Sequence, residues 1–173
     1  MIPGYLVASP LGDIALRAED DALTGVYFVG QKYYPELVLV TDVRQVPRVI
    51  SMAQEQLTEF FAGQRREFEL PLRFRGTPFQ EQVWRELARI PYGELLSYGC
   101  MAKKMGLSAG HSRAVGTANG KNPISIIVPC HRVIGASGDL TGYAGGVERK
   151  RALLALENNN GLAELAFELV SRN

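Results

Sequence analysis

The chain has 173 residues, a hydrophobic share of 46% and a formal net charge of +1, values typical of a folded globular protein rather than a disordered or fibrous one. No apolar run approaches the roughly 18 residues that a membrane span needs, and the first residues lack the pattern of a signal peptide. The two cysteines, Cys100 and Cys130, can form one disulfide at most. Because a chain of this length folds without a disulfide, the composition indicates the reducing cytoplasm.

The charge is unevenly distributed along the chain. Residues 1–76 carry 8 Lys and Arg against 10 Asp and Glu, whereas residues 77–157 carry 10 against 6. A positive surplus of this size weakly favours a polyanionic partner, and it also occurs in enzymes with other substrates.

Residues 1–76 predict a small α/β domain. Short runs rich in β-branched and aromatic residues, at 5–8, 14–18 and 23–28, are separated by turn-forming residues and predict a small antiparallel sheet. Apolar residues with a 3.6-residue period from Val46 to Phe61 predict a helix that Gly63 ends. The polar stretch 65–75 is expected to be an extended connector, and we expect a domain boundary at Gly76.

Residues 77–173 predict a second, mainly helical domain, so the expected fold class is α+β. Its first helix has a clear start, because Thr77 supplies a capping hydroxyl, Pro78 takes the first helical position and Gln80 the third. The apolar stripe of this helix runs to Ile90, and Pro91-Tyr92-Gly93 breaks it.

A helix–turn–helix is predicted next, from a helix at 97–105, a glycine-containing turn and a second helix at 111–120. One face of the second helix carries Arg113, Gly116, Thr117 and Gly120 at helical spacing. Such a face has no pair of long polar side chains to read base edges, but it can approach a sugar–phosphate backbone closely. If the helix binds DNA, it therefore binds without sequence preference. A tightly packed core helix would have a similar composition.

Cys130 is the candidate nucleophile. The β-branched run 124–128 is predicted to be a buried strand, and Pro129 bends the chain before Cys130 and His131. A thiol reacts as its thiolate, which a neighbouring imidazole favours. The alternative is a cysteine that only packs in the core, since free cysteine is among the most buried residue types.

A glycine-rich loop, residues 135–146, follows the cysteine and carries one aromatic residue, Tyr143. It lacks the spacing of a dinucleotide or Walker loop, so a pocket wall is the better interpretation. Residues 147–158 then predict a helix with Glu157 near its end. Because no metal-binding spacing joins the few Cys and His residues, we expect no metal and no other cofactor.

Residues 127–133, Ile-Val-Pro-Cys-His-Arg-Val, resemble the active-site signature of the O6-alkylguanine-DNA alkyltransferases. Residues 113–116, Asn122-Pro123 and residues 142–146 lie around it at the spacing of that family. The resemblance extends from about Gly76 to Glu157, whereas the first 76 residues match only in size and in the order of strands and helix. It implies a ribonuclease-H-like N-terminal domain and a winged-helix-like C-terminal domain, without an added regulatory domain.

The resemblance implies DNA repair by direct reversal. Cys130 would accept the alkyl group of O6-alkylguanine and keep it, so that one molecule repairs one lesion. His131 would take the thiol proton through a water, and Glu157 would orient His131. Asn122 would brace the turn before the active site, and Tyr98 would donate a hydrogen bond to the guanine. Activity on O4-alkylthymine remains open.

The implied partner is double-stranded DNA, bound by a monomer without sequence preference. The damaged nucleotide would rotate out of the duplex, at a cost of roughly a few kcal/mol, and Arg113 would fill the gap. The other implied DNA contacts are Ser112, Ala114, Gly116, Thr117, Gly120 and Tyr98, and the guanine pocket would be lined by Val133, Tyr143 and Ala144.

The sequence departs from the family pattern at several positions. His111 has no family counterpart that explains it, and Ala144 replaces a serine that could bond O6 in some members. Residues 1–99 contain no Cys and no His, so the N-terminal zinc site of some members is excluded. Cys100 is expected to pack within the helix–turn–helix.

Two other functions remain as alternatives. A non-catalytic protein that binds alkyl lesions would lack the cysteine, so Cys130 argues against it. A cysteine hydrolase would use Cys130, His131 and Glu157 as an acyl-transfer triad, but no oxyanion motif accompanies them. The number of alkyl groups transferred per molecule distinguishes all three.

Overall fold

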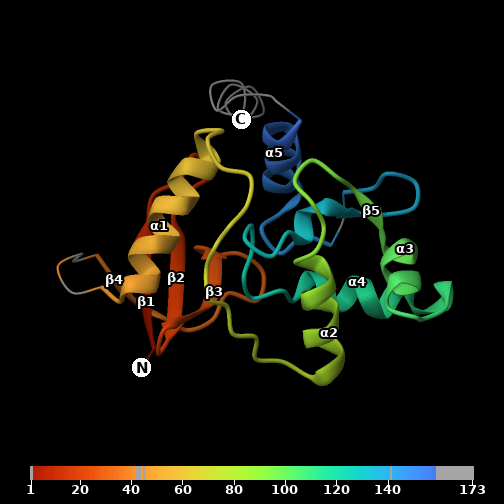
Figure 1. Ribbon diagram of the computed structural model, residues 1–173, viewed down its shortest axis with the longest axis horizontal. Helices are drawn as coiled ribbons and strands as arrows, with labels where there is room; N and C mark the ends of the chain where they lie inside the picture. The colour runs from red at the N-terminus through yellow and green to blue at the C-terminus, as the bar shows by residue number, and fades with distance from the viewer. Residues whose placement is uncertain (1, 42–43, 45, 141, 159–173) are drawn as a thin grey trace.

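The computed structural model describes residues 2–41, 44, 46–140 and 142–158. Figure 1 shows an N-terminal part, made of a sheet and helix α1, beside a C-terminal part made mostly of helices. The expected α+β class is therefore confirmed. Among the described residues, every helix is too short or too polar to cross a bilayer.

The N-terminal sheet has four strands in the order β3-β2-β1-β4. β1 (Pro3–Val7), β2 (Ile14–Glu19) and β3 (Ala22–Phe28) are antiparallel neighbours, as predicted. β4 (Val38–Val40) was not predicted, and it pairs with β1 in parallel, so the sheet is mixed rather than purely antiparallel. Its three residues are too few for a visible alternation of apolar and polar positions.

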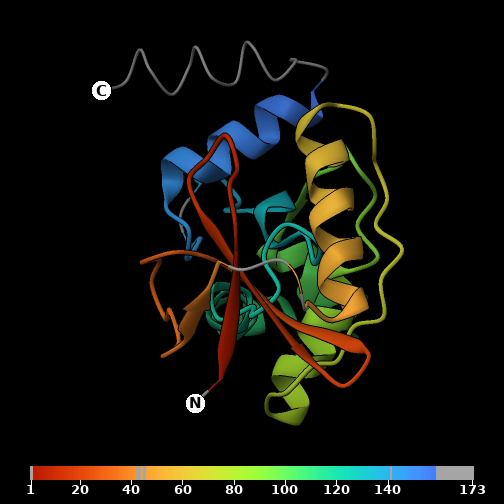
Figure 2. The ribbon, with the colours of Figure 1, turned by 90° about the vertical axis from the view of Figure 1, so that its left-hand side faces the viewer.

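Helix α1 (Arg48–Phe61) covers one side of this sheet (Figure 2). Its buried residues, among them Ile50, Leu57 and Phe60, have the predicted helical period and pack into the core. The helix starts two residues later than predicted, after Pro47, and its end is followed by Gly63 at φ 75°, a backbone conformation that glycine adopts without strain.

The free edge of β3 joins the two parts of the molecule. Leu23 N donates to Pro71 O at 2.8 Å, which attaches the connector to the strand. Val26 N donates to Pro123 O at 2.9 Å, and Ser125 N donates to Val26 O at 3.1 Å. The segment before Cys130 is therefore fixed to the N-terminal sheet. No helix or strand of the described residues crosses Gly76.

Helix α2 (Pro78–Leu87) begins with the predicted capping box. Gln80 N donates to Thr77 Oγ1 at 3.1 Å, and Thr77 N donates to the side chain of Gln80 at 3.0 Å. Trp84 is buried on the inner side of α2, and its Nε1 donates to Ala118 O at 2.9 Å. This bond holds α2 against the helix that carries the predicted DNA contacts.

The predicted helix–turn–helix is present. It consists of α3 (Tyr98–Lys104), a 3₁₀ turn η2 (Ala109–His111) and α4 (Ser112–Gly120). Two very short strands, β5 (Leu96–Ser97) and β6 (Val133–Ile134), pair in parallel and were not predicted. The last described helix is α5 (Val147–Glu157).

Candidate active site

The segment before Cys130 is not the strand that its composition predicts. Ile124 makes one bridge to Val26, after which the chain turns, with Ile126 at φ 72° and Val128 N donating to Ile124 O at 3.0 Å. The prediction was wrong because a run of β-branched residues indicates burial, and burial here comes mostly from a compact turn that meets strand β3 at a single bridge.

The side chain of Asn122 holds this turn closed. Its Nδ2 donates to Val128 O at 2.9 Å and to Ile124 O at 3.3 Å, while its Oδ1 accepts from Ile124 N at 3.0 Å. Because Asn122 is buried, these bonds replace those that a strand partner would provide.

Cys130 and His131 lie on a 3₁₀ turn, η3 (Cys130–Arg132). Cys130 is 3% exposed, and Asn119 Nδ2 donates to its carbonyl oxygen at 3.4 Å. Burial raises the pKa of the Cys130 thiol to about 11, although the Asn122 amide and the charge of Lys150 each lower it. The resting thiol is therefore protonated at neutral pH, and its reaction requires a nearby base.

His131 is completely buried and is hydrogen-bonded to Glu157. The distance between His131 Nε2 and Glu157 Oε2 is 2.6 Å. Arg132 donates to the same carboxylate twice, from Nε at 2.8 Å and from Nη2 at 2.9 Å. Its third bond, from Nη1 to Ile90 O at 2.6 Å, fixes the guanidinium to the end of the α2 region.

The protonation states follow from these contacts. Burial would raise the pKa of Glu157, but the bonds from His131 and Arg132 outweigh it and hold that pKa at about 2. Burial lowers the pKa of His131 below its ordinary value of 6.5. Since the ionised Glu157 can only accept, neutral His131 carries its proton on Nε2. Nδ1, which has no hydrogen-bond partner among the described residues, is left as an acceptor.

Two charged residues of this site were missed by the sequence reasoning. Arg132 was read only as part of a motif, although it shares Glu157 with His131. Lys150 is fully buried, and its Nζ donates to Val133 O at 2.7 Å. Burial lowers its pKa to about 8, and the nearby Cys130 opposes this shift. No signal in the sequence marks it, because lysine is almost never fully buried.

The predicted guanine-pocket residues differ in burial. Val133 and Tyr143 are buried, and burial followed by the charge of Cys130 raises the pKa of Tyr143 well above 10. The same two causes, in the same order, raise the pKa of Tyr98. Ala144 is half-buried, and its carbonyl oxygen accepts from Lys32 N at 3.1 Å.

Gly142 makes room for Tyr98. A Cβ atom at Gly142 would lie 2.9 Å from the Tyr98 hydroxyl oxygen, and the backbone there has φ 80°. Both the space and the conformation require glycine. The ring of Tyr98 also lies 3.7 Å from the Cβ position of Gly116, so the tyrosine separates α4 from the loop after Cys130.

Helix α4 turns its predicted contact face outward. Arg113, Ala114 and Thr117 are exposed, while Ser112, Gly116 and Gly120 are half-buried. The opposite face, Val115, Ala118 and Asn119, packs inward. Asn119 is the link between this helix and Cys130.

Two further expectations concern Cys100 and His111. Cys100 does not pack within the helix–turn–helix as predicted, because it is exposed on α3. The bond of Ser97 and the charges of Lys103 and Lys104 lower its pKa. His111 is exposed before α4, with Nδ1 3.1 Å from Ser108 Oγ, and this contact gives it a place in the turn but no chemical role.

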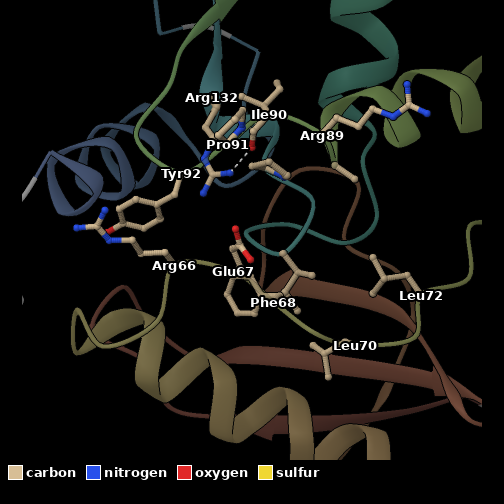
Figure 3. Close-up of a pocket in the computed structure, with 13 residues that line it drawn as sticks. Arg66, Glu67, Phe68, Leu70, Leu72, Arg89, Ile90, Pro91, Tyr92 and Arg132 are labelled. Carbon is tan, nitrogen blue, oxygen red and sulfur yellow. Dashed lines mark hydrogen bonds between the residues drawn. The ribbon is translucent and has the colours of Figure 1, made fainter.

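A cavity of about 350 Å³ lies behind the η3 turn (Figure 3). It separates the connector from the end of the α2 region, and Arg132 and Tyr92 form part of its wall. Cys130 and the predicted guanine-pocket residues do not line it. This cavity is therefore separate from the predicted guanine pocket.

Two family models match the chain. The ribonuclease-like domain of 6-O-methylguanine DNA methyltransferase matches residues 4–74, and the DNA-binding domain of the same family matches residues 78–159.

Curated relatives and solved structures agree with these models. A methylated-DNA–protein-cysteine methyltransferase of Mycolicibacterium paratuberculosis is 50% identical over 167 residues, which cover 96% of this chain and 99% of the relative. The constitutive methyltransferase of that name from Bacillus subtilis is 45% identical over 152 residues, covering 86% and 91%. The crystal structure of Mycobacterium tuberculosis OGT in complex with DNA matches with a TM-score of 0.84 and 46% identity, covering 95% of this chain and 98% of that one.

Proposed function

This chain belongs to the 6-O-methylguanine DNA methyltransferase family, and we propose that it repairs O6-alkylguanine in double-stranded DNA by moving the alkyl group onto Cys130. The observation that carries the assignment of Cys130 is the buried η3 turn, in which the thiol adjoins a histidine whose Nε2 is bound to an ionised Glu157. Cys100, the other cysteine, lies exposed on α3.

The reaction begins with removal of the thiol proton. Because the pKa of Cys130 is about 11, the proton leaves only when a base takes it. The candidate base is His131, the next residue, whose Nδ1 is unprotonated and has no hydrogen-bond partner among the described residues. We propose transfer through one water molecule. Glu157 then stabilises the imidazolium, and the buried Lys150 ammonium favours the thiolate.

The thiolate next attacks the alkyl carbon in line with the O6 bond. A C–S bond forms as the C–O6 bond breaks, and the bonding electron pair remains on O6 of the guanine. The guanine then takes up one proton, which balances the one that Cys130 lost. The raised pKa of Tyr98 keeps its hydroxyl protonated, so that it can donate a hydrogen bond to the departing base. Nothing in this site hydrolyses a thioether, so each molecule reacts once.

DNA binding is assigned to the exposed face of α4. Arg113 is its one long side chain, and we propose that it fills the gap left by the rotated nucleotide. The small residues Ala114, Gly116 and Gly120 allow close approach to the backbone without contacts to base edges, so binding is independent of sequence. We further propose that the protein acts as a monomer in the cytoplasm, with both cysteines reduced.

The protein mass should rise by the mass of one methyl group after incubation with excess O6-methylguanine duplex. The added methyl group should lie on the peptide that contains Cys130, because Cys130 is followed by a buried histidine that an ionised Glu157 orients. Intact-protein and peptide mass spectrometry measure both quantities. A methyl group on Cys100, or more than one group transferred per molecule, would contradict the mechanism, and an unchanged mass would favour the non-catalytic lesion binder.

Arg113→Ala should slow repair of duplex DNA more than reaction with free O6-benzylguanine base. Only the duplex requires that a nucleotide be held outside the stack, and losing the side chain that fills the gap should cost on the order of 1–3 kcal/mol, which slows the duplex reaction roughly 5- to 150-fold. Single-turnover rates on both substrates measure this difference.

Tyr98→Phe is the matched comparison for Arg113→Ala. Its hydroxyl acts on the guanine itself, so its loss should slow both substrates. If Arg113→Ala also slows both equally, Arg113 supports the fold or the thiolate rather than the rotated nucleotide.

A further inference from the structure

A cluster of one aromatic and two cationic side chains lies at the junction of the two parts of the chain. We call Lys32, Tyr33 and Lys121 the Tyr33 cluster. Lys32 Nζ lies 5.1 Å from the centre of the Tyr33 ring, and Lys121 Nζ lies 5.6 Å from the same centre. Lys32 and Tyr33 belong to the segment between β3 and β4, whereas Lys121 follows α4 directly. Two ammonium groups from distant parts of the sequence therefore surround one ring.

The Tyr33 cluster continues the exposed face of α4. Arg113, Thr117 and Lys121 are all exposed and lie four residues apart, so they occupy one side of the helix. At a rise of about 1.5 Å per residue, Arg113 and Lys121 are roughly 12 Å apart along the axis, about three base-pair steps of DNA. A duplex that contacts Arg113 along this face therefore reaches Lys121.

The position of Tyr33 is fixed by the wall of the proposed guanine pocket. Lys32 N donates to Ala144 O at 3.1 Å, which attaches the segment to the loop after Cys130. Tyr33 itself has φ 62°, a conformation that non-glycine residues rarely adopt, and it is 54% exposed. A large ring that is exposed at an energetic cost to the backbone indicates that this surface has a use.

The charge of the Tyr33 cluster is not balanced within the described part of the chain. Neither Lys32 nor Lys121 has an ion-pair partner there, while the acidic residues of the same sheet, such as Glu19, pair with arginines. An external anion would offset the repulsion between two ammonium groups on one ring. A backbone phosphate of DNA is such an anion.

We propose that Lys32, Tyr33 and Lys121 form a second DNA-contact surface, through which the N-terminal part of the chain binds a backbone phosphate of the duplex on α4. This inference rests on the proposed function, because it takes the exposed face of α4 as the DNA side. The N-terminal part then has a direct role in holding the duplex while the nucleotide is rotated out.

The test is the salt dependence of binding to an unmodified duplex, measured by fluorescence anisotropy. The double variant Lys32→Gln/Lys121→Gln removes the one proposed phosphate contact, so the slope of log K against log salt should become smaller by about one. At roughly 0.1 M salt the affinity should fall on the order of ten-fold. Tyr33→Leu should weaken binding less, because both charges remain.

The matched control is Arg48→Gln/Arg66→Gln, which removes the same net charge from exposed positions on α1 and the connector. In Figure 2, α1 lies on one side of the sheet and the segment between β3 and β4 lies on the other. This control should keep the slope of the unchanged protein. Thermal unfolding midpoints of both double variants establish that each is folded.

The outcomes separate this inference from the proposed function. If the unchanged protein methylates Cys130 and binds the duplex, but both double variants bind equally well, the Tyr33 cluster does not contact DNA and the inference is wrong. The Lys32→Gln/Lys121→Gln variant could instead bind the duplex as tightly as the control and show altered self-association in sedimentation. That result would assign the Tyr33 cluster to protein–protein contact and would also overturn the inference. Failure of the unchanged protein to methylate Cys130 would instead contradict the proposed function.

Discussion

Glu157→Gln is expected to lower the free energy of unfolding by roughly 3–5 kcal/mol, the cost of leaving one buried charge without its partner. Glu157 accepts two bonds from Arg132 and one contact from His131, and all three side chains are buried. A glutamine keeps the volume but offers one neutral oxygen, so the Arg132 guanidinium remains buried and uncompensated. Urea unfolding at neutral pH measures the loss.

The stability of the unchanged protein should also fall in acid, with a predictable range. The folded pKa of Glu157, about 2, lies below its ordinary value of 4.5, so its contribution is complete above pH 4.5 and is lost as the pH falls toward 2. The pKa of His131 is also lowered by folding, so stability begins to fall below its ordinary value of 6.5. In the Glu157→Gln variant, the free energy of unfolding should decrease less below pH 4.5 than it does in the unchanged protein.

The same substitution should slow alkyl transfer to Cys130 roughly 10²- to 10⁴-fold, the usual contribution of a positioned base. Without the carboxylate, neither the Nε2–H form of neutral His131 nor the imidazolium is favoured. The double variant Arg132→Met/Glu157→Gln is the control, because replacing both charges removes the unpaired guanidinium and should recover part of the stability. A double variant that recovers the rate along with the stability would show that Glu157 acts only through the fold.

The sequence predicts those elements whose signals are local. The capping residues Thr77 and Gln80 predict the start of α2 because both bonds of the box lie within three residues. The period of apolar residues predicts α1 for the same reason, since one helix face is buried against the sheet. The strands β4, β5 and β6 have at most three residues each, and their partners are distant in the sequence, so no local signal marks them.

The active site shows the same difference between local and distant signals. The position of Cys130 beside His131 is visible in the sequence. The turn that leads into η3 is held by bonds between the Asn122 side chain and the backbone of Ile124 and Val128, which the sequence does not show. The run 124–128 has the composition of a strand, and only the tertiary bridge to Val26 determines where it ends. Lysine is almost never fully buried, so the sequence predicts that Lys150 lies on the exposed side of α5. The structure buries it completely.

Cys130→Ala is expected to abolish alkyl transfer while retaining binding to lesion-containing duplex. The DNA contacts proposed above lie on α4 and around Tyr98, and the substitution removes only a buried thiol. Transfer of a labelled methyl group and anisotropy with the lesion duplex measure the two properties separately. Cys100→Ala is the matched control and should transfer one methyl group at the unchanged rate, since Cys100 lies on the exposed side of α3.

The two cysteines make this experiment decisive, because thiol acidity and geometry predict opposite results. The pKa of the exposed Cys100 is lowered, while burial raises that of Cys130 to about 11, so acidity alone would select Cys100. Geometry selects Cys130, because only there can the proton pass to a histidine that an ionised carboxylate orients. If Cys130→Ala still transfers the methyl group and the label lies on Cys100, the local base is irrelevant and the resting acidity of the thiol determines the acceptor. If transfer is lost in Cys130→Ala and kept in Cys100→Ala, burial has made the thiol unreactive until the base in its own pocket removes the proton.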